Sequence, residues 1–478
     1  MRQTRLWLVT FVVVAVAGQL AVGMRASRTA TVTGDEPFYL ATAQSLVSDG
    51  DLDLRDEYAP AAAQREFRRF WDGTVPLWRQ MEPTRDGRLL APHEPGLPLL
   101  IAPAYAVGGL EGVRRWLVLL WAAAMAFAAL LVRRVLPYAP AVLAIGTAVV
   151  VGAGVPGLVY ASQVYPEGPA ALCVAAALVV LASDRARPVL LAALLVALAW
   201  LGVKYVPLAA LLGALAVPTW FWARSSPHVG LSAPKTRLVA AGVFVTVAAV
   251  HYAWWHLHTF GGFTPYGTNV VWAGEGTASI VADHVDVANR TYRLYGLFVD
   301  ARFGLFVWLP AAVLAIVGVR RATLRYAAAV GVCVLMGTFA SITIMGWWFP
   351  GRMLIAAFPV LTVLIATGAA RLPRTASAVL GAWSLAIAAA TAWGAHHRWI
   401  RVAVDPFDLG VPLPPRWLFP DFREFAAPEI LASLGWLAAA VGLVSFARWR
   451  PSCSWTATPL PTAPSSRSRP RSRPLPGR

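Results

Sequence analysis

The sequence LWLVTFVVVAVAGQLAVG at residues 6–23, followed by GDEPFYL at residues 34–40, determines how the rest of the chain is interpreted. The first stretch is apolar, and as a helix it is long enough to cross most of a hydrocarbon core of about 30 Å. The second stretch places two adjacent carboxylates, Asp35 and Glu36, shortly after that helix. Two carboxylates on a loop that leaves a membrane span predict an active site at the membrane surface.

The composition is that of an integral membrane protein. The 478 residues are 58% hydrophobic and only 14% charged, whereas average soluble domains carry about 25% charged residues. The mean hydropathy is +0.59, and the 21 Trp residues suit the aromatic belts at membrane interfaces. The net charge of +17 suits cytoplasmic loops and anionic lipid headgroups. Because the chain has no recognisable RNA- or DNA-binding motif, we expect no nucleic acid partner.

Apolar segments of transmembrane length recur along the chain and predict an all-α polytopic membrane protein with about 12 transmembrane helices. A further apolar segment at 97–110 is short and follows Pro95 and Gly96, which predicts a re-entrant or surface-lying helix. The predicted spans are residues 6–24, 116–132, 138–158, 167–182, 188–203, 205–222, 238–257, 303–319, 326–345, 353–370, 376–395 and 429–447.

The distribution of Lys and Arg predicts the orientation in the plasma membrane. If the N-terminus is inside, nearly every short inside connection carries two or more positive charges, as the positive-inside rule expects. Both termini are then cytoplasmic, and residues 1–447 form one transmembrane domain. The Pro-, Ser- and Arg-rich tail, 448–478, has the composition of a disordered segment. The predicted outer loops are 25–115, 159–166, 258–302, 346–352 and 396–428, of which the first is large.

Asp35 and Glu36 allow two interpretations. Asp35 suits the N-cap of a helix with Pro37 in its first turn, and Glu36 then suits the positive end of the helix dipole. That helix would lie along the membrane surface, with apolar residues such as Tyr39 and Leu40 on one face. Capping needs only one of the two carboxylates, however. A carboxylate can also take a proton from an acceptor hydroxyl or orient a metal, as glycosyl transfer requires.

Two further polar stretches fall on the predicted outer side. His93 and Glu94 precede the short apolar segment, where they could bind a phosphate or metal or make ordinary loop contacts. Glu167 follows Tyr165 and Pro166 at the outer mouth of a span. Because Pro and Glu both suit a helix start, a capping role is the simpler explanation of Glu167, and an acidic group facing the first loop is the alternative.

Two cations occupy the outer ends of predicted spans. Lys204 interrupts the apolar run 188–222, where it could extend toward the interface or bind an anionic phosphate. Arg352 follows the aromatic stretch Trp347–Phe349 and starts a span on the outer side, against the positive-inside trend. Arginine is well suited to bidentate phosphate recognition.

The topology that Lys and Arg bias alone predicts brings these residues to one side of the membrane. Carboxylates and cations gathered on one face are the arrangement expected for handling a lipid-linked phosphosugar. The candidate residues on the outer side are Asp35, Glu36, His93, Glu94, Glu167, Lys204 and Arg352.

At these residues the sequence resembles the GT-C superfamily of polytopic glycosyltransferases, most nearly protein O-mannosyltransferases and the lipid A aminoarabinose transferase. The resemblance covers roughly residues 1–370 and rests on short motifs. One is a first span followed by Asp35-Glu36, Tyr39 and an Ala-Gln-Ser-Leu helix. The others are HEPGLP at 93–98, similar to the family's His-Pro-Pro-Leu stretch, YPE at 165–167, and WWFPGR at 347–352. Glu94 departs from the family's pattern, which has Pro or Lys at that position.

The resemblance implies a polyprenyl-phosphate sugar donor and an active site on the outer face. Asp35 would be the catalytic base toward the acceptor, supported by Glu36. Arg352, Lys204 and His93 would hold the donor phosphate, with Glu167 and Glu94 as supporting acidic residues. The acceptor would be a glycan, lipid or protein, and a divalent metal is compatible with the site but not required.

The alternative interpretation is a secondary transporter or flippase of a lipid-linked or small polar substrate. About 12 spans suit a transporter, but transporters usually place functional charges near the bilayer midplane and contain repeated halves. In this sequence the candidate charges lie at the outer edge, and the large first loop has no counterpart in the second half.

Overall fold

A computed structural model describes the chain at residues 3–27, 30–32, 34–58, 79–84, 86–183, 186–221, 235–265, 287–341, 348–402, 416–422 and 427–449. Within these ranges the regular elements are all helices, which confirms the all-α prediction. The tail beyond 449 and residues 266–286 of the predicted outer loop 258–302 lie outside the described residues.

The N-terminal half forms α1 (Gln3–Gly18), α2 (Glu36–Ser48), α4 (Gly96–Val135), α5 (Ala141–Ala153), α6 (Gly157–Tyr160), α7 (Glu167–Leu181), α8 (Pro188–Leu201), the short η3 (Val203–Tyr205), α9 (Val206–Phe221) and α10 (Lys235–Phe260). The C-terminal half forms α13 (Val287–Arg290), α14 (Arg293–Val299), α15 (Leu305–Trp308), η6 (Pro310–Val313), α16 (Leu314–Gly318), η7 (Arg321–Thr323), α17 (Leu324–Leu335), the π-turn η8 (Met336–Ala340), η9 (Arg352–Ala357), α18 (Phe358–Ala369), α19 (Arg374–His396), η11 (Arg416–Leu418) and α20 (Ala427–Trp449).

Seven helical stretches in the described residues are long and apolar enough to cross a membrane. Four other apolar helices are shorter, and the segment predicted as span 303–319 is divided among α15, η6 and α16. The count of about 12 spans therefore stays a prediction. The seven long stretches are Gln3–Ala21, Gly96–Val135, Lys235–Phe260, Arg321–Ala340, Arg352–Ala369, Arg374–His396 and Ala427–Trp449.

The segment 97–110, predicted as a separate short helix, continues into the next predicted span. Together they form α4, which is 40 residues long and broken at Gly108 and Gly109. Gly109 has a φ of +53°, a left-handed conformation that glycine adopts without a Cβ penalty. Because the chain leaves helical geometry at these two glycines, the segment before them is a separate helical piece, as predicted, and it joins the span without a connecting loop.

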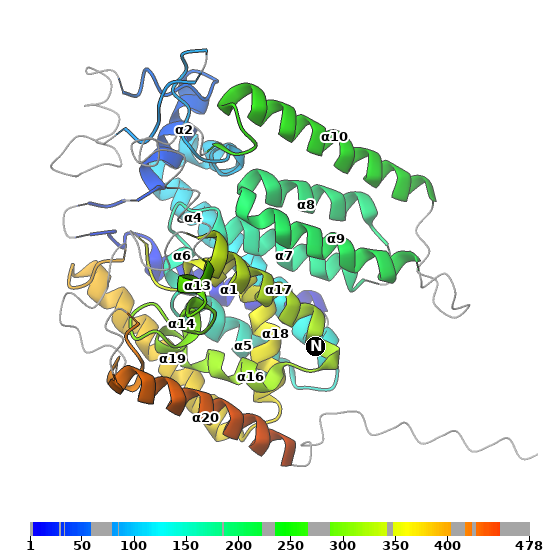
Figure 1. Cartoon of the computed structure of the whole chain (residues 1–478), viewed down its shortest axis with the longest axis vertical. Helices are drawn as coiled ribbons and strands as arrows, with labels where there is room; N and C mark the ends of the chain where they lie inside the picture. The colour runs from blue at the N-terminus through cyan, green and yellow to red at the C-terminus, as the bar shows by residue number, and fades with distance from the viewer. Residues whose placement is uncertain are drawn as a thin grey trace, which may run out of the picture.

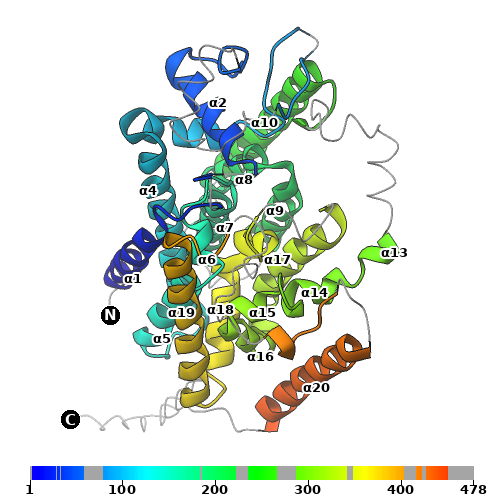
Figure 2. The same cartoon turned by 90° about the vertical axis from the view of Figure 1, so that its left-hand side faces the viewer.

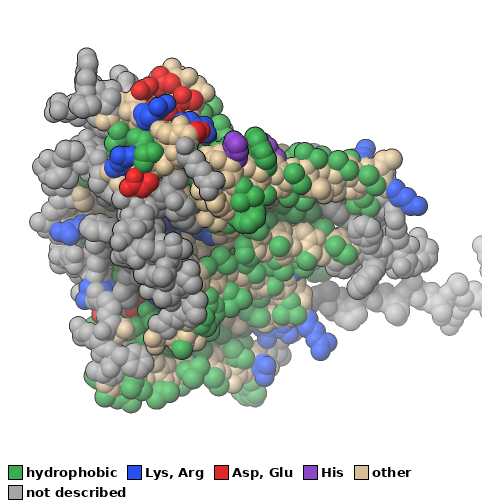
Figure 3. All heavy atoms as spheres, turned by 45° about the horizontal axis from the view of Figure 1, so that its top comes forward, with side chains coloured by type: hydrophobic (Ala, Val, Ile, Leu, Met, Phe, Trp, Pro, Cys, Tyr) green, Lys and Arg blue, Asp and Glu red, His purple; other side chains and the backbone are tan. Residues whose placement is uncertain are grey.

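The core lies where α4, α7, α16 and α18 pack together, and α18 is buried along almost its whole length. Two helices lie at the periphery (Figure 1): α10 beside α8 on one side and α20 on the other. Only 6% of the apolar window of each is buried. Hydrophobic side chains cover much of the exposed surface between the two ends of the molecule (Figure 3). Such a surface is expected of helices that face lipid.

The helix α2 lies at one end of the molecule, away from the N-terminus (Figures 1 and 2). Its first ten residues, 36–45, are all buried, whereas the prediction gave it only one apolar face. The segment around Asp53 and Leu89 is joined by two hydrogen bonds, from Leu54 N to Leu89 O and from Leu89 N to Asp53 Oδ1. These bonds join two distant parts of the first loop, and the apolar pattern of the α2 sequence gives no sign of them.

The contact between α16 and α18 depends on glycine. A Cβ atom at Gly368 would lie 1.9 Å from the carbonyl oxygen of Leu314, which is backbone that cannot rotate away. We therefore expect Gly368→Ala to lower the free energy of unfolding by about 1–3 kcal/mol through overpacking. Thermal unfolding in detergent measures this effect. Gly442→Ala on α20 is the control, because its Cβ meets nothing within 4 Å among the described residues, and equal melting temperatures for the two variants would contradict the prediction.

Candidate functional site

Asp35 occupies the N-cap position of α2, but its side chain makes no capping hydrogen bond within the described structure. Its Oδ2 instead accepts a hydrogen bond from Arg352 Nη2 at 3.2 Å, and its Oδ1 lies 3.9 Å from His93 Nε2. The side chain is 27% exposed. The Asp35 side chain therefore does not cap α2; it pairs with Arg352 and stays partly exposed, and its role as a proton acceptor stays a prediction.

Arg352 lies at the centre of the site and contacts both of its carboxylates. It begins η9 directly after Gly351, whose φ of +80° is left-handed, and a Cβ on that glycine would lie 2.6 Å from Pro156 Cγ. Arg352 Nε donates to Glu167 Oε1 at 2.8 Å, while its guanidinium carbon lies 4.1 Å from the centre of the Tyr165 ring. The side chain is only 7% exposed. Two carboxylates and an aromatic face therefore hold a buried guanidinium in one orientation.

Glu167 also binds the second cation. Its Oε1 accepts a hydrogen bond from Lys204 Nζ at 2.6 Å, and Lys204 lies in η3, between α8 and α9. Glu167 is 2% exposed and Lys204 is 32% exposed. The other oxygen, Glu167 Oε2, is buried and has no hydrogen-bond partner among the described residues. Buried charges are stable only when paired, and these two carboxylates and two cations balance to a formal charge of zero.

His93 lies against the same cluster as a buried imidazole. Its ring stacks on Tyr39 at a centroid distance of 4.7 Å, and its Nε2 lies 3.1 Å from Gln80 Oε1. Burial lowers the pKa of His93 below its ordinary value, and the attraction of Asp35 only partly offsets this. A neutral His93 cannot supply positive charge to a phosphate at neutral pH. In this geometry the positive charge comes from Arg352 and Lys204.

Asp35 remains ionised in this environment. Burial acts to raise the pKa of Asp35, but the positive charges of His93 and Arg352, with a smaller contribution from Lys204, hold that pKa below its ordinary value. His93 contributes only where it is protonated, which is the acidic range in which Asp35 itself would titrate. At neutral pH, Asp35 is therefore an anion beside a guanidinium.

Two of the predicted site residues lie outside this cluster. Glu36 is 1% exposed, and its Oε2 accepts a hydrogen bond from Val164 N at 2.9 Å. Glu36 thus binds the backbone at Val164, whereas Asp35 binds the Arg352 side chain. The pairing of Glu36 with Asp35 as a second catalytic carboxylate is therefore not supported.

Glu94 points toward α10. It accepts a hydrogen bond from the Tyr252 hydroxyl, and its Oε2 lies 2.9 Å from Nε2 of His256, which is fully buried. Glu94 thus ties the start of α4 to the peripheral helix α10 and does not support the Asp35 cluster. His93 and Glu94 are adjacent in the sequence but face different elements.

The sequence interpretation missed the roles of several side chains. Tyr165 stacks on Arg352, and its hydroxyl lies 3.4 Å from Asp35 N. Gln80 meets His93, and His256 with Tyr252 meets Glu94. One signal was available for His256, since an ionisable residue inside an apolar helix usually has a buried partner.

The described residues contain no group of three or more His, Cys, Asp or Glu side chains arranged to hold a metal ion. In the cluster, Arg352 and Lys204 both bind Oε1 of Glu167, and Arg352 also binds Oδ2 of Asp35. Trp347 and the stretch Asp283–Asp286, which carries side chains of metal-ligand type, lie outside the described residues. Comparison with protein-family models, curated proteins and solved structures finds no match to this chain.

The buried, neutral His93 predicts a pH dependence of stability. In the unfolded chain His93 takes up a proton near its ordinary pKa of 6.5, but in the folded protein that pKa is lower. Between these two pKa values the unfolded state binds more protons, so the free energy of unfolding falls as the pH falls below about 6.5. We expect His93→Gln to make the melting temperature less dependent on pH over this window. His397→Gln, at an exposed histidine, is the control, and curves parallel to wild type for both variants would contradict the prediction.

Proposed function

We propose that this protein is a membrane glycosyltransferase that transfers a sugar from a polyprenyl-phosphate donor to an acceptor hydroxyl. The observation that supports this proposal most is the Asp35–Arg352–Glu167–Lys204 cluster, in which a reachable, ionised carboxylate adjoins two oriented cations. Such an arrangement suits a reaction that takes a proton from one group while negative charge develops on another.

Lys204 is the residue best placed to meet the donor phosphate first. An ammonium group has three N–H donors, and in the described structure one of them goes to Glu167. Its 32% exposure leaves the other side of the group accessible. Arg352 is more deeply buried and oriented by Glu167 and Asp35, so that it supplies fixed positive charge without needing to reorganise.

The transfer step then follows from the roles of these groups. The acceptor oxygen forms a bond to the anomeric carbon of the donor, and its proton passes to the Asp35 carboxylate. The bond between the anomeric carbon and the phosphate oxygen breaks, and the electron pair leaves with the polyprenyl phosphate. Arg352 and Lys204 stabilise the charge that develops on that leaving group.

The proposal places the cluster on the outer face of the plasma membrane, with both chain termini inside. The acidic side chains visible in Figure 3 gather at the end that carries α2. The opposite ends of the helices include Arg133 and Arg134 of α4 and Lys235 of α10, as expected of a cytoplasmic side. The likeness of these motifs to GT-C glycosyltransferases supports the same assignment.

We expect Asp35→Asn to abolish transfer while leaving the fold intact. Asn keeps the size of Asp and can still accept a hydrogen bond from Arg352, but it cannot take a proton. The rate should fall roughly 100-fold or more, as when a general base is lost. The measurement is label transfer in membranes supplied with a mixture of radiolabelled polyprenyl-phosphate sugars, at matched expression and with size-exclusion profiles compared. Asp49→Asn is the matched control, because Asp49 is the exposed residue at the other end of α2.

The outcomes of this experiment distinguish a glycosyltransferase from a transporter or flippase. Transfer by wild type and by Asp49→Asn, lost in Asp35→Asn, supports the enzyme. Transfer that persists in Asp35→Asn removes Asp35 from the chemistry. Uptake of label into vesicles without any covalent transfer would favour the transporter or flippase interpretation instead.

A further inference from the structure

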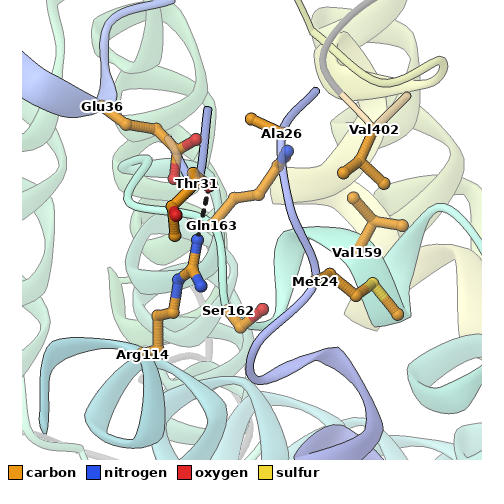
Figure 4. A pocket seen from close by; sticks show the side chains of 9 residues that line it. All are labelled: Met24, Ala26, Thr31, Glu36, Arg114, Val159, Ser162, Gln163 and Val402. Carbon is orange, nitrogen blue, oxygen red and sulfur yellow. Dashed lines mark hydrogen bonds between the residues drawn. The ribbon is translucent and has the colours of Figure 1, made fainter. Parts of the chain in front are cut away.

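A small cavity lies beside the cluster, on the side of α2 to which Glu36 turns (Figure 4). Its polar lining includes Glu36, Arg114 and Gln163 together with Thr31 and Ser162, and its apolar lining includes Met24 and Val402. The space admits one group of about the size of a water molecule or a hydroxyl. None of these residues belongs to the Asp35–Arg352–Glu167–Lys204 cluster.

Buried groups of both signs line the cavity. Glu36 is 1% exposed and Arg114 is 3% exposed, and Arg114 Nη2 donates to the carbonyl oxygen of Thr31 at 3.0 Å. Gln163 is 7% exposed, and its Oε1 has no hydrogen-bond partner in the part of the chain that the structure describes. A buried amide oxygen without a donor is costly. The cavity therefore calls for a group that donates a hydrogen bond to Gln163.

The chemistry of the walls restricts what that group can be. A phosphate or carboxylate has no proton to donate to Gln163 and is repelled by Glu36. An ammonium group can donate but is repelled by Arg114. A hydroxyl donates to an amide oxygen or a carboxylate and accepts from a guanidinium. A hydroxyl, of water or of an alcohol, can therefore donate to Gln163 and accept from Arg114, while Glu36 already accepts from Val164 N.

The cavity and the cluster are bordered by the same two chain segments. Along the first, Asp35 faces Arg352 and the next residue, Glu36, faces the cavity. Along the second, Gln163 lines the cavity, Val164 N donates to Glu36, and the Tyr165 ring lies under Arg352. Since the Cα atoms of the consecutive residues Asp35 and Glu36 are about 3.8 Å apart, the cavity and the cluster are direct neighbours.

We propose that this cavity binds a second hydroxyl of the acceptor and that the acceptor is therefore a carbohydrate. The inference rests on the proposed glycosyl transfer at Asp35. A sugar presents several hydroxyls within a few ångströms, so one can react at Asp35 while a neighbour binds Gln163. A serine or threonine side chain of a protein acceptor has only one hydroxyl and leaves the cavity unfilled by substrate.

The test compares acceptors that share a tail but differ in their hydroxyls. Membranes containing the full chain receive the radiolabelled donor mixture with either octyl glycosides of glucose, mannose and galactose or octanol. For wild type we expect at least one octyl glycoside to be labelled about tenfold more efficiently than octanol, because it can fill the cavity. Gln163→Met keeps the length of the side chain and removes the amide oxygen. We expect it to abolish that preference.

A matched control separates binding from folding. Gln44 is also 7% exposed, and its Oε1 accepts a hydrogen bond from the Tyr105 hydroxyl outside the cavity. Gln44→Met should lower stability without changing the preference for glycosides over octanol. A Gln163→Met variant that labels both acceptors less, in equal proportion, has a merely structural defect and overturns the inference.

The remaining outcomes distinguish this inference from the proposed function. Wild type that labels octanol and the glycosides equally, or labels only endogenous protein, retains transferase activity but overturns a carbohydrate acceptor. An unchanged preference in Gln163→Met means that the cavity holds only water, and this also overturns the inference. Wild type that labels nothing, including endogenous acceptors, overturns the proposed function and this inference with it.

Discussion

The buried guanidinium of Arg352 is the interaction on which the site depends. It joins Asp35 and Glu167, which lie 317 and 185 positions away in the sequence. A buried charge that has no ion-pair partner destabilises the fold far more than a buried charge that is paired. The start of η9 is therefore held against α7 and the start of α2. The same constraint brings Lys204 to Glu167, so that four charged side chains from four parts of the chain meet with no net formal charge.

The ion pairs of the cluster fix the orientation of its two cations, Arg352 and Lys204. Carboxylates that hold the cations in place also restrict them, so the positive charge is oriented before any substrate arrives, which is the condition for strong electrostatic stabilisation of a developing anion. Asp35 is the more exposed carboxylate of the cluster, whereas Glu167 is almost fully buried. Glu167 binds both cations, and in the proposed reaction Asp35 is the carboxylate that faces the acceptor. Glu36, turned by one helical step, borders a separate cavity.

The packing of the other helices supports the end of the molecule that carries the cluster. Close glycine contacts between α16 and α18 and the buried face of α4 form a dense centre, while α10 and α20 leave apolar side chains on the surface. The Glu94–His256 contact ties α10 to the loop that carries His93. A peripheral helix that is otherwise packed mainly on α8 is in this way connected to the polar end.

The sequence alone determined that the chain is helical and as apolar as a membrane protein, and it singled out most of the residues that meet in the site, because hydropathy, helix-start residues and out-of-place charges are local properties. Those residues are Asp35, Glu167, Lys204, Arg352 and His93. Only the tertiary structure decided which of them touch. Glu36 and Glu94 are as polar and as well placed in the sequence as Asp35 and His93, but the direction of each side chain depends on helix phase and on distant partners such as Val164 and His256. The protonation of His93 and the role of Tyr165 were likewise decided by burial and by the packing of segments that are far apart in the chain.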